Sequence, residues 1–195
     1  MIAALFAHSR PFVHRLRGAI LAPMPDRDSP AGGPTVRWSS TADADGLADL
    51  HRSAWRYAYA GIIPGLALER MIARRGRPWW RRMHERGFRA LVAESMGTVA
   101  GYATLGSGRG GPLRTGEIYE LYVRPEHHGC GIGSRLFSGA RRELAGHGLD
   151  RLVVWALADN TVACRFYEAM GGAEYGRAED RFCGVPLDKV GFSWT

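Results

Sequence analysis

Glycine occupies three alternate positions, 129, 131 and 133, between an apolar segment and an amphipathic one. Because glycine adopts positive φ and has no side chain, the backbone there can approach a ligand and point successive N–H groups at one anion. Residues 116–123, just before, are rich in the β-branched and aromatic types that favour a strand, and apolar residues after the glycines recur at helical spacing. A helix beginning here adds partial positive charge. The sequence therefore predicts a phosphate-binding loop over 129–134, between a strand and a helix.

Two other nucleotide-binding patterns also place glycines between a strand and a helix, and spacing separates them from this one. A dinucleotide fingerprint starting at Gly129 requires glycine at position 134, where this chain has Ser134. A P-loop requires lysine directly after its last glycine, and the first lysine of the chain is Lys189. Neither pattern is satisfied, although Asp150 lies about where a ribose-binding acid is expected.

A second segment with a distinct pattern follows downstream. Residues 152–157 form a continuous apolar run that predicts a buried strand. Residues 160–171 predict a short helix, capped by Asp159 or Asn160 and ended by Gly171. Strand, loop and helix therefore occur twice in succession.

The two segments, in this order, resemble the GNAT superfamily of N-acetyltransferases. Residues 128–133 match its acyl-CoA motif, Gln/Arg-x-x-Gly-x-Gly/Ala, and the later helix matches Asn-x-x-Ala-x-x-Phe-Tyr-Glu-x-x-Gly. The chain departs from the family at His128, where Gln or Arg is usual, and at Gly172, where an aromatic residue is usual. The close resemblance covers residues 115–171, and a looser one extends from about residue 36 to the C-terminus.

The resemblance implies a mixed α/β (α+β) fold. In this fold a largely antiparallel sheet of six to seven strands has flanking helices, and two central parallel strands splay apart. Hydrophobic and turn patterns agree with that layout. Besides the elements above, they predict a strand at 35–38, helices at 41–59 and after Pro64, hairpin strands at 88–94 and 98–105, a glycine-rich loop at 106–116, and final strands at 173–182 and 188–194.

Residues 1–34 differ in composition from the rest of the chain. They contain several arginines, no acidic residue before Asp26, and a final stretch rich in proline, glycine and serine. This composition resembles a transit peptide, whereas the alternative is a disordered extension or an over-long start, since Met24 could begin the domain. We expect an N-terminal extension over 1–34 and one GNAT domain over 35–195.

The resemblance implies acetyl-CoA as co-substrate and assigns residues to its parts. The pyrophosphate would lie on the glycine loop, and the pantetheine arm between the splayed strands, with its thioester beside free N–H groups. The loop residues are His128, Gly129, Cys130, Gly131, Ile132, Gly133 and Ser134, and those along the arm are Leu121, Tyr122, Val123 and Asn160. A mostly neutral His128 would attract the pyrophosphate less than arginine does, so we expect a weaker site but not a lost one.

Acyl transfer to an amine needs a base for the amine proton and an acid for the leaving thiolate. Tyr167 matches the family tyrosine near the CoA sulfur and is the expected acid, with core packing as the alternative. Glu117 and Glu120 are the candidate bases, and without a bulge they face opposite sides of their strand, so that only one reaches the cleft. Glu117 is preferred because it falls where the histone-acetyltransferase branch carries its base.

These residues predict transfer of an acetyl group from acetyl-CoA to a primary amine of a small molecule or protein, by direct attack within a ternary complex. The residues expected to border the acceptor cleft are Trp55, Tyr57, Tyr59 and 61–64, with Trp79-Trp80 as a further candidate. The identity of the acceptor does not follow from the two motifs. The alternatives are an acyl-CoA-binding regulator without turnover and a nucleic-acid-binding module.

The formal charge of +7 and an arginine-rich run at 70–89 bear on the last alternative. Arginines interleaved with tryptophans can stack on bases, but a solvated helical face with a tryptophan anchor explains the same residues. Nucleic acid is therefore not expected as a partner. A basic surface also favours CoA, which carries several phosphate charges.

Cysteine, histidine and apolar patterns bear on metals, location and membranes. Three cysteines, Cys130, Cys164 and Cys183, are an odd number without metal-type pairing, which fits a reducing, cytoplasmic location. The histidines show no metal-ligand spacing, so no metal is expected. Apolar runs are far shorter than the ~20 residues of a membrane span, so no membrane association is expected. A monomer and a homodimer both remain open.

Overall fold

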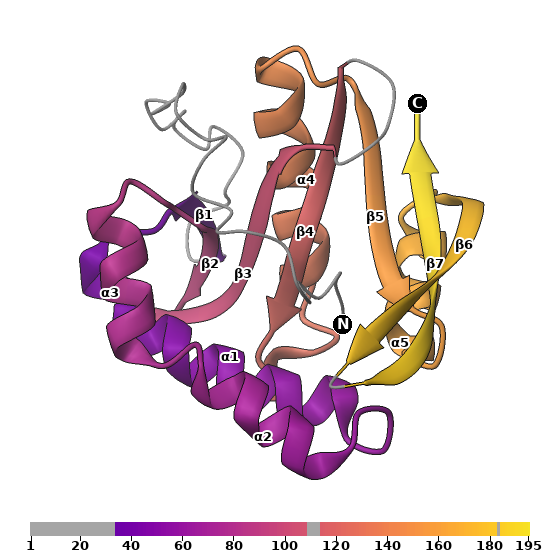
Figure 1. Ribbon diagram of the computed structural model, residues 1–195. Helices are drawn as coiled ribbons and strands as arrows, with labels where there is room; N and C mark the ends of the chain where they lie inside the picture. Colours follow the sequence, from indigo (N-terminus) through magenta and orange to yellow (C-terminus); the bar gives the residue numbers. More distant parts are fainter. Residues whose placement is uncertain (1–33, 109–113, 183) are drawn as a thin grey trace.

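The computed structural model describes residues 34–108, 114–182 and 184–195 (Figure 1). The extension expected over 1–34 lies outside the described residues except for its last position, and the loop expected over 106–116 is described only near its two ends. The boundary between the extension and the domain stays a prediction.

The described strands form one seven-stranded sheet in the order β1-β2-β3-β4-β5-β7-β6. Neighbouring strands are antiparallel except for β4 and β5, which are parallel. The predicted mixed, largely antiparallel sheet is confirmed. The strands are β1 Thr35–Trp38, β2 Leu91–Ser95, β3 Thr98–Ser107, β4 Thr115–Val123, β5 Arg151–Leu157, β6 Ala173–Phe182 and β7 Val185–Trp194.

The α-helices in the described residues are α1 Ala44–Tyr59, α2 Gly65–Ala73, α3 Arg77–Glu85, α4 Ile132–Gly146 and α5 Thr161–Ala169. Two helices were expected before the hairpin, but there are three, because the arginine-rich run is divided at Gly76. Gly76 is extended (ψ 177°) and Pro78 lies in the first turn of α3, where proline is tolerated although it cannot continue α2. None of the described helices is long and apolar enough to cross a membrane.

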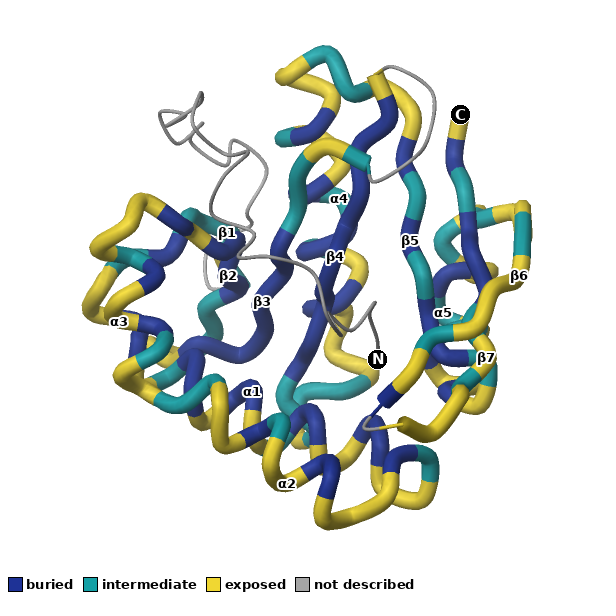
Figure 2. Tube along the Cα trace, in the orientation of Figure 1, coloured by how far each residue is buried: buried dark blue, intermediate teal, exposed yellow. Residues whose placement is uncertain are grey.

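The helices cover the two faces of the sheet. α4 packs across β1 to β5 on one face, and α1 packs on β3 and β4 from the other. On β3, a Cβ at Gly101 would lie 2.7 Å from the Leu136 side chain of α4, whereas the next residue, Tyr102, contacts His51 of α1. α5 packs on β5 and β7. Between these layers β4 is buried along its whole length (Figure 2).

β4 and β5 separate toward their carboxyl ends. They pair from Thr115, opposite Arg151, to Ile118, opposite Val154, where the pairing between them ends. β5 continues to pair with β7 as far as Leu157, so the strands diverge while both stay in the sheet. Figure 1 shows the two ribbons moving apart toward their arrowheads. The splayed central pair is confirmed.

A β-bulge interrupts the alternation of β4. Thr104 of β3 lies opposite Glu120, and the next residue, Leu105, lies opposite Ile118, so Tyr119 is the extra residue on β4. The Tyr119 hydroxyl donates to a backbone carbonyl of β3. The bulge therefore lies where β4 loses its pairing with β5.

The bulge changes where the two candidate bases point. Glu117 lies opposite Gly106, two residues from Thr104, so its side chain shares a face with that of Glu120, and α1 covers this face. The expectation that the carboxylates face opposite sides was wrong, because the extra residue shifts the alternation by one position. The glycine at position 106 leaves space for the side chain of the extra residue, because a Cβ at position 106 would lie only 2.9 Å from the Tyr119 hydroxyl.

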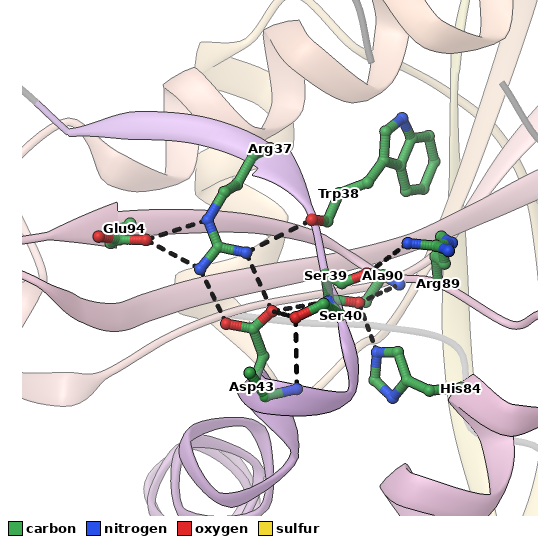
Figure 3. Close-up of polar contacts among 10 residues, drawn as sticks. Arg37, Trp38, Ser39, Ser40, Asp43, His84, Arg89, Ala90 and Glu94 are labelled. Carbon is green, nitrogen blue, oxygen red and sulfur yellow. Dashed lines mark hydrogen bonds and ion pairs between the residues drawn. The ribbon is translucent and has the colours of Figure 1, made fainter. Parts of the chain in front are cut away.

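Charged side chains join the edge strand β1 to the start of the first helix (Figure 3). Arg37 donates to both carboxylate oxygens of Asp43, at 2.8 and 2.9 Å, and to Glu94 of β2, at 2.8 and 3.0 Å. Asp43 also accepts the Ser40 N–H and completes a capping box. The Arg37 guanidinium lowers the pKa of Asp43 below its ordinary value. The network holds β1, β2 and α1 in one arrangement.

Candidate active site

The glycine loop has the backbone geometry expected of an anion-binding loop. Gly129 and Gly131 have φ of 79° and 74°, in the left-handed region that favours glycine, and Gly131 is the N-cap of α4. No side chain caps this helix. A Cβ at Gly131 would meet no atom within 4 Å, so the space beside the helix start is open. Uncapped N–H donors and the positive end of α4 therefore meet at an open position.

His128 ties the loop to the end of β4. Its Nε2 donates to the Val123 carbonyl at 3.2 Å, and its ring packs edge-on against Tyr57, with centroids 5.0 Å apart. Burial lowers the pKa of His128, so the ring is neutral near pH 7. The neighbouring Cys130 and Ser134 are exposed. His128 thus supports the loop by its position and adds no charge.

Helix α5 carries two buried polar groups that have no partner in the described structure. Asn160 Oδ1 accepts the Ala163 N–H at 3.2 Å, which makes Asn160 the helix cap, while its Nδ2 has no hydrogen-bond partner. The Tyr167 hydroxyl is fully buried and also has none. An unpaired buried polar group costs about 1–3 kcal/mol, so a hydrogen-bond partner for either atom would be stabilising.

Tyr167 is buried between α4 and β7. Its ring contacts Phe137 of α4 and Phe192 of β7, on the α4 side of the sheet. Burial raises the pKa of Tyr167, and Tyr59 of α1, from the opposite face, contributes to the same shift. The Tyr167 hydroxyl therefore stays protonated at neutral pH and can donate a hydrogen bond.

The two carboxylates share a face but have different surroundings. Both are buried, with 1% of Glu117 and 2% of Glu120 exposed. Glu120 forms an ion pair with Arg75, in the turn between α2 and α3, and accepts the Thr104 hydroxyl at 3.3 Å. Glu117 lies near Tyr175 of β6, whose pKa is raised by burial and by the Glu117 charge.

A cleft of about 630 Å³ lies between the α1–α2 connection and the start of β7. Residues 61–64, expected beside the acceptor, line it, and so does Val185 at the start of β7. Trp55, Tyr59 and Trp80 were expected near an acceptor as well, but they are buried in an aromatic cluster against β3 and β4. Their large apolar rings pack on the sheet because they lie on the inner sides of α1 and α3.

Comparison with known proteins places this arrangement in a family. The sequence model described as "Acetyltransferase (GNAT) family" matches residues 47–172, from within α1 to just past α5. The chain belongs to this family. The GNAT chain is 31% identical over 164 residues to mycothiol acetyltransferase of Salinispora tropica and 28% identical over 162 residues to that of Thermobispora bispora, with 83% and 80% of this chain covered. It spans about half the length of these curated relatives, 51% and 52%.

A solved structure shares the GNAT fold. The PaiA N-acetyltransferase from Thermoplasma acidophilum in complex with coenzyme A has a TM-score of 0.64 at 20% identity, covering 80% of this chain and 98% of that chain. At this identity the match shows the fold alone. The predicted superfamily and fold class are confirmed, while the roles of individual residues stay predictions.

Two residues of the candidate site were not foreseen from the sequence. Arg75 was expected among the arginines of a solvated helical face over 70–89. Its position directly before Gly76 is the only local sign that its side chain does not lie on that solvated face. Val185 carries no sequence signal at all, since β7 was expected to begin three residues later, at Asp188. Within the described ranges, no group of three or more side chains of metal-ligating type is brought together.

Proposed function

We propose that this GNAT protein transfers the acetyl group of acetyl-CoA to a primary amine by direct attack in a ternary complex. The observation that carries the proposal is Tyr167, a buried and protonated hydroxyl without a partner in the described residues, on the helix that follows β5. A tyrosine that only fills a core is expected to pair its hydroxyl. Family membership, and the coenzyme A in the Thermoplasma structure, support a CoA thioester as donor.

The proposal gives each part of acetyl-CoA a place on the backbone. The pyrophosphate binds the N–H groups of the loop over 129–134, which His128 positions. The pantetheine arm lies along β4 beyond its last pair with β5, where residues 121–123 offer N–H groups and Asn160 offers its unpaired Nδ2. Because backbone amides do not titrate, this binding should depend little on pH.

The chemistry requires three further roles. The amine nitrogen attacks the thioester carbonyl, forming the C–N bond, while N–H groups of residues 121–123 stabilise the oxyanion, an interaction worth ~10²–10³ in rate per donor. Glu117 takes the amine proton, directly or through water. As the C–S bond breaks, Tyr167 donates a proton to the CoA sulfur. We assign the base to Glu117 because it falls, counted back from His128, where the histone-acetyltransferase branch of the family carries its base.

The acceptor is assigned to the cleft between residues 61–64 and Val185. This cleft is bordered by apolar side chains and by the Arg56–Glu69 ion pair, with distances of 2.7 Å. A lining of this kind suits the body of a small-molecule amine or the end of a peptide. A cytoplasmic location, in which Cys130 and Cys164 stay free thiols, belongs to the same proposal.

The test is a screen of amines with detection of the released CoA thiol. Small-molecule amines, peptide N-termini and lysine side chains are each incubated with the full chain and acetyl-CoA, and one class should give amine-dependent release together with an acetylated product by mass spectrometry. CoA binding without amine-dependent release in any class would instead support a regulator that binds acyl-CoA. If the protein neither binds CoA nor releases thiol with any amine, the result contradicts both the acetyltransferase and the acyl-CoA-binding regulator.

A further inference from the structure

One buried ion pair lies outside the proposed chemistry. Arg75, from the turn between α2 and α3, donates through Nη1 to Glu120 Oε1, and only 17% of the arginine side chain and 3% of the glutamate side chain are exposed. The guanidinium also lies over the Trp79 ring of α3, 5.0 Å from its centroid. Arg75 is thus a mostly covered member of a run whose neighbours Arg74, Arg81 and Arg82 are exposed.

The pair reaches the part of β4 that matters most for the proposed reaction. Glu120 directly follows the bulged Tyr119 and directly precedes the segment 121–123, which is proposed to hold the thioester. Its second oxygen accepts the Thr104 hydroxyl of β3 at 3.3 Å. The bulge is therefore held from β3 by Thr104 and from the helices by Arg75.

The energetics of buried ion pairs indicate that this pair contributes more to the position of β4 than to the stability of the fold. Removing two charges from water costs about as much as their attraction returns, and apolar replacements of buried pairs are often neutral or stabilising. An ion pair supplies one defined geometry, because guanidinium and carboxylate groups meet at fixed angles, whereas apolar contact does not.

We propose that Arg75 and Glu120 form a clasp that positions the bulge of β4 for catalysis. The clasp holds the N–H groups of residues 121–123 and the side chain of Glu117 in register with the thioester carbonyl, and it couples that register to the α2–α3 turn. Both are positioning residues and neither touches the reacting atoms. The inference rests on the proposed function, since it concerns the same site.

The first test compares Arg75→Met with Arg75→Lys and with Arg77→Met. Arg75→Met should lower kcat by about ten-fold or more, because displacements below 1 Å at a reacting centre have effects of this size. The KM for acetyl-CoA should change little, since the glycine loop is not touched. Arg75→Lys keeps the charge without the planar group and should recover part of kcat. Arg77→Met removes an exposed ion pair between α3 and Asp45 of α1 and should leave kcat unchanged.

The second test separates position from stability. Arg75→Met leaves a buried carboxylate without its cation and should lower Tm, whereas Arg75→Met/Glu120→Met removes both charges and should restore Tm. The clasp predicts that kcat of the double variant stays low although Tm recovers. Recovery of kcat together with Tm would show that the pair serves stability alone and would overturn the proposal. A Glu120→Met variant whose activity recovers at high pH would overturn it too, by making Glu120 the base.

A third readout does not need turnover. In the protein without CoA, Arg75→Met should speed amide hydrogen exchange at residues 119–123 by about ten-fold relative to Arg77→Met, because β4 there has lost its support. Unchanged exchange would overturn the clasp whether or not the enzyme acts on an amine. If the wild-type protein releases no thiol with any amine, the proposed function fails while this measurement still decides the clasp.

Discussion

At the scale of single residues, Tyr167 combines two properties that rarely occur together, a buried hydroxyl and no partner for it in the described structure. Tyr167→Phe removes only that oxygen. Because the oxygen is unpaired, the variant should keep or slightly raise the unfolding free energy without CoA. It should lower kcat by about ten-fold or more with little change in the KM for acetyl-CoA, since only proton donation is lost. Steady-state kinetics and urea unfolding measure the two effects, and a loss of stability with unchanged kcat would make Tyr167 a packing residue.

Glu117 is the second residue whose role can be isolated. Glu117→Gln keeps the side-chain volume and removes the charge, so kcat/KM should fall by at least about ten-fold at pH 7 if Glu117 takes the amine proton. A lysine-like amine has a pKa of about 10.4, so more free amine is present as pH rises and the variant should recover part of its activity.

The matched control for this variant is Glu168→Gln, an exposed carboxylate on α5 outside the proposed site. Its pH–rate profile should overlay that of the wild-type protein. Equal losses in both variants, or a Glu117→Gln deficit that is the same at every pH, would mean that another group or bulk water accepts the proton.

At the scale of elements, the start of α4 is a loop whose backbone requires glycine. Gly131→Val adds a branched side chain at φ 74° in the space assigned to the pyrophosphate, so CoA affinity should fall by about ten-fold or more. Gly97→Val is a matched control, because Gly97 has φ 75° in the β2–β3 turn and a Cβ there also meets nothing within 4 Å. Both variants should lose similar stability, but calorimetry should find CoA affinity reduced only in Gly131→Val. Equal affinities would remove the loop from the CoA site.

The edge strand β1 depends on charge, and its contribution to stability should depend on pH. The pKa of Asp43 is lowered in the folded protein by Arg37, so its stabilising effect is complete above the unfolded pKa and is lost as pH falls through the folded value. Asp43→Asn should therefore lower the unfolding free energy by about 1–2 kcal/mol at pH 7, a range reduced for the partial exposure of Arg37. The difference from wild type should shrink below about pH 4.

Urea unfolding at several pH values measures this difference. Asp49→Asn, which breaks an exposed pair with Arg52 on α1, serves as control and should change stability by less than about 0.5 kcal/mol at any pH. An Asp43→Asn effect that does not vary between pH 7 and pH 3 would show that the network acts through packing and not through charge.

At the scale of the whole molecule, a net charge of +7 attracts any polyanion, and exposed arginines on α3 add to this. Raising the salt concentration separates specific binding of CoA from the general attraction of polyanions to a basic surface. CoA at 100 times its Kd should stabilise the fold by about 2.7 kcal/mol, and most of this should persist at moderate salt because uncharged parts of CoA also bind. Stabilisation by RNA or DNA should disappear as salt rises. Thermal melts in both conditions check this, and the reverse pattern would favour the nucleic-acid module.

The sequence alone determined those features that arise among neighbouring residues. Positive φ at Gly129 and Gly131, a helix cap at Asp159 or Asn160 and the apolar strand at 152–157 depend on contacts within a few positions, so motif and periodicity were enough to predict them, and the structure shows that the cap is Asn160. The splayed sheet was predicted as well, but through resemblance to a family and not from local physics.

Only the tertiary structure decided how the candidate bases are arranged. Glu120 meets Thr104 across 16 positions of sequence and Arg75 across 45, and the bulge at Tyr119 is defined by the pairing of β4 with β3, where Gly106 leaves space for the Tyr119 side chain. Alternation along one strand does not contain this information, since an extra residue reverses the facing of every position beyond it. The same holds for Tyr167, whose sequence neighbours predict a helix, while the rings that bury it, Phe137 of α4 and Phe192 of β7, come from distant parts of the chain.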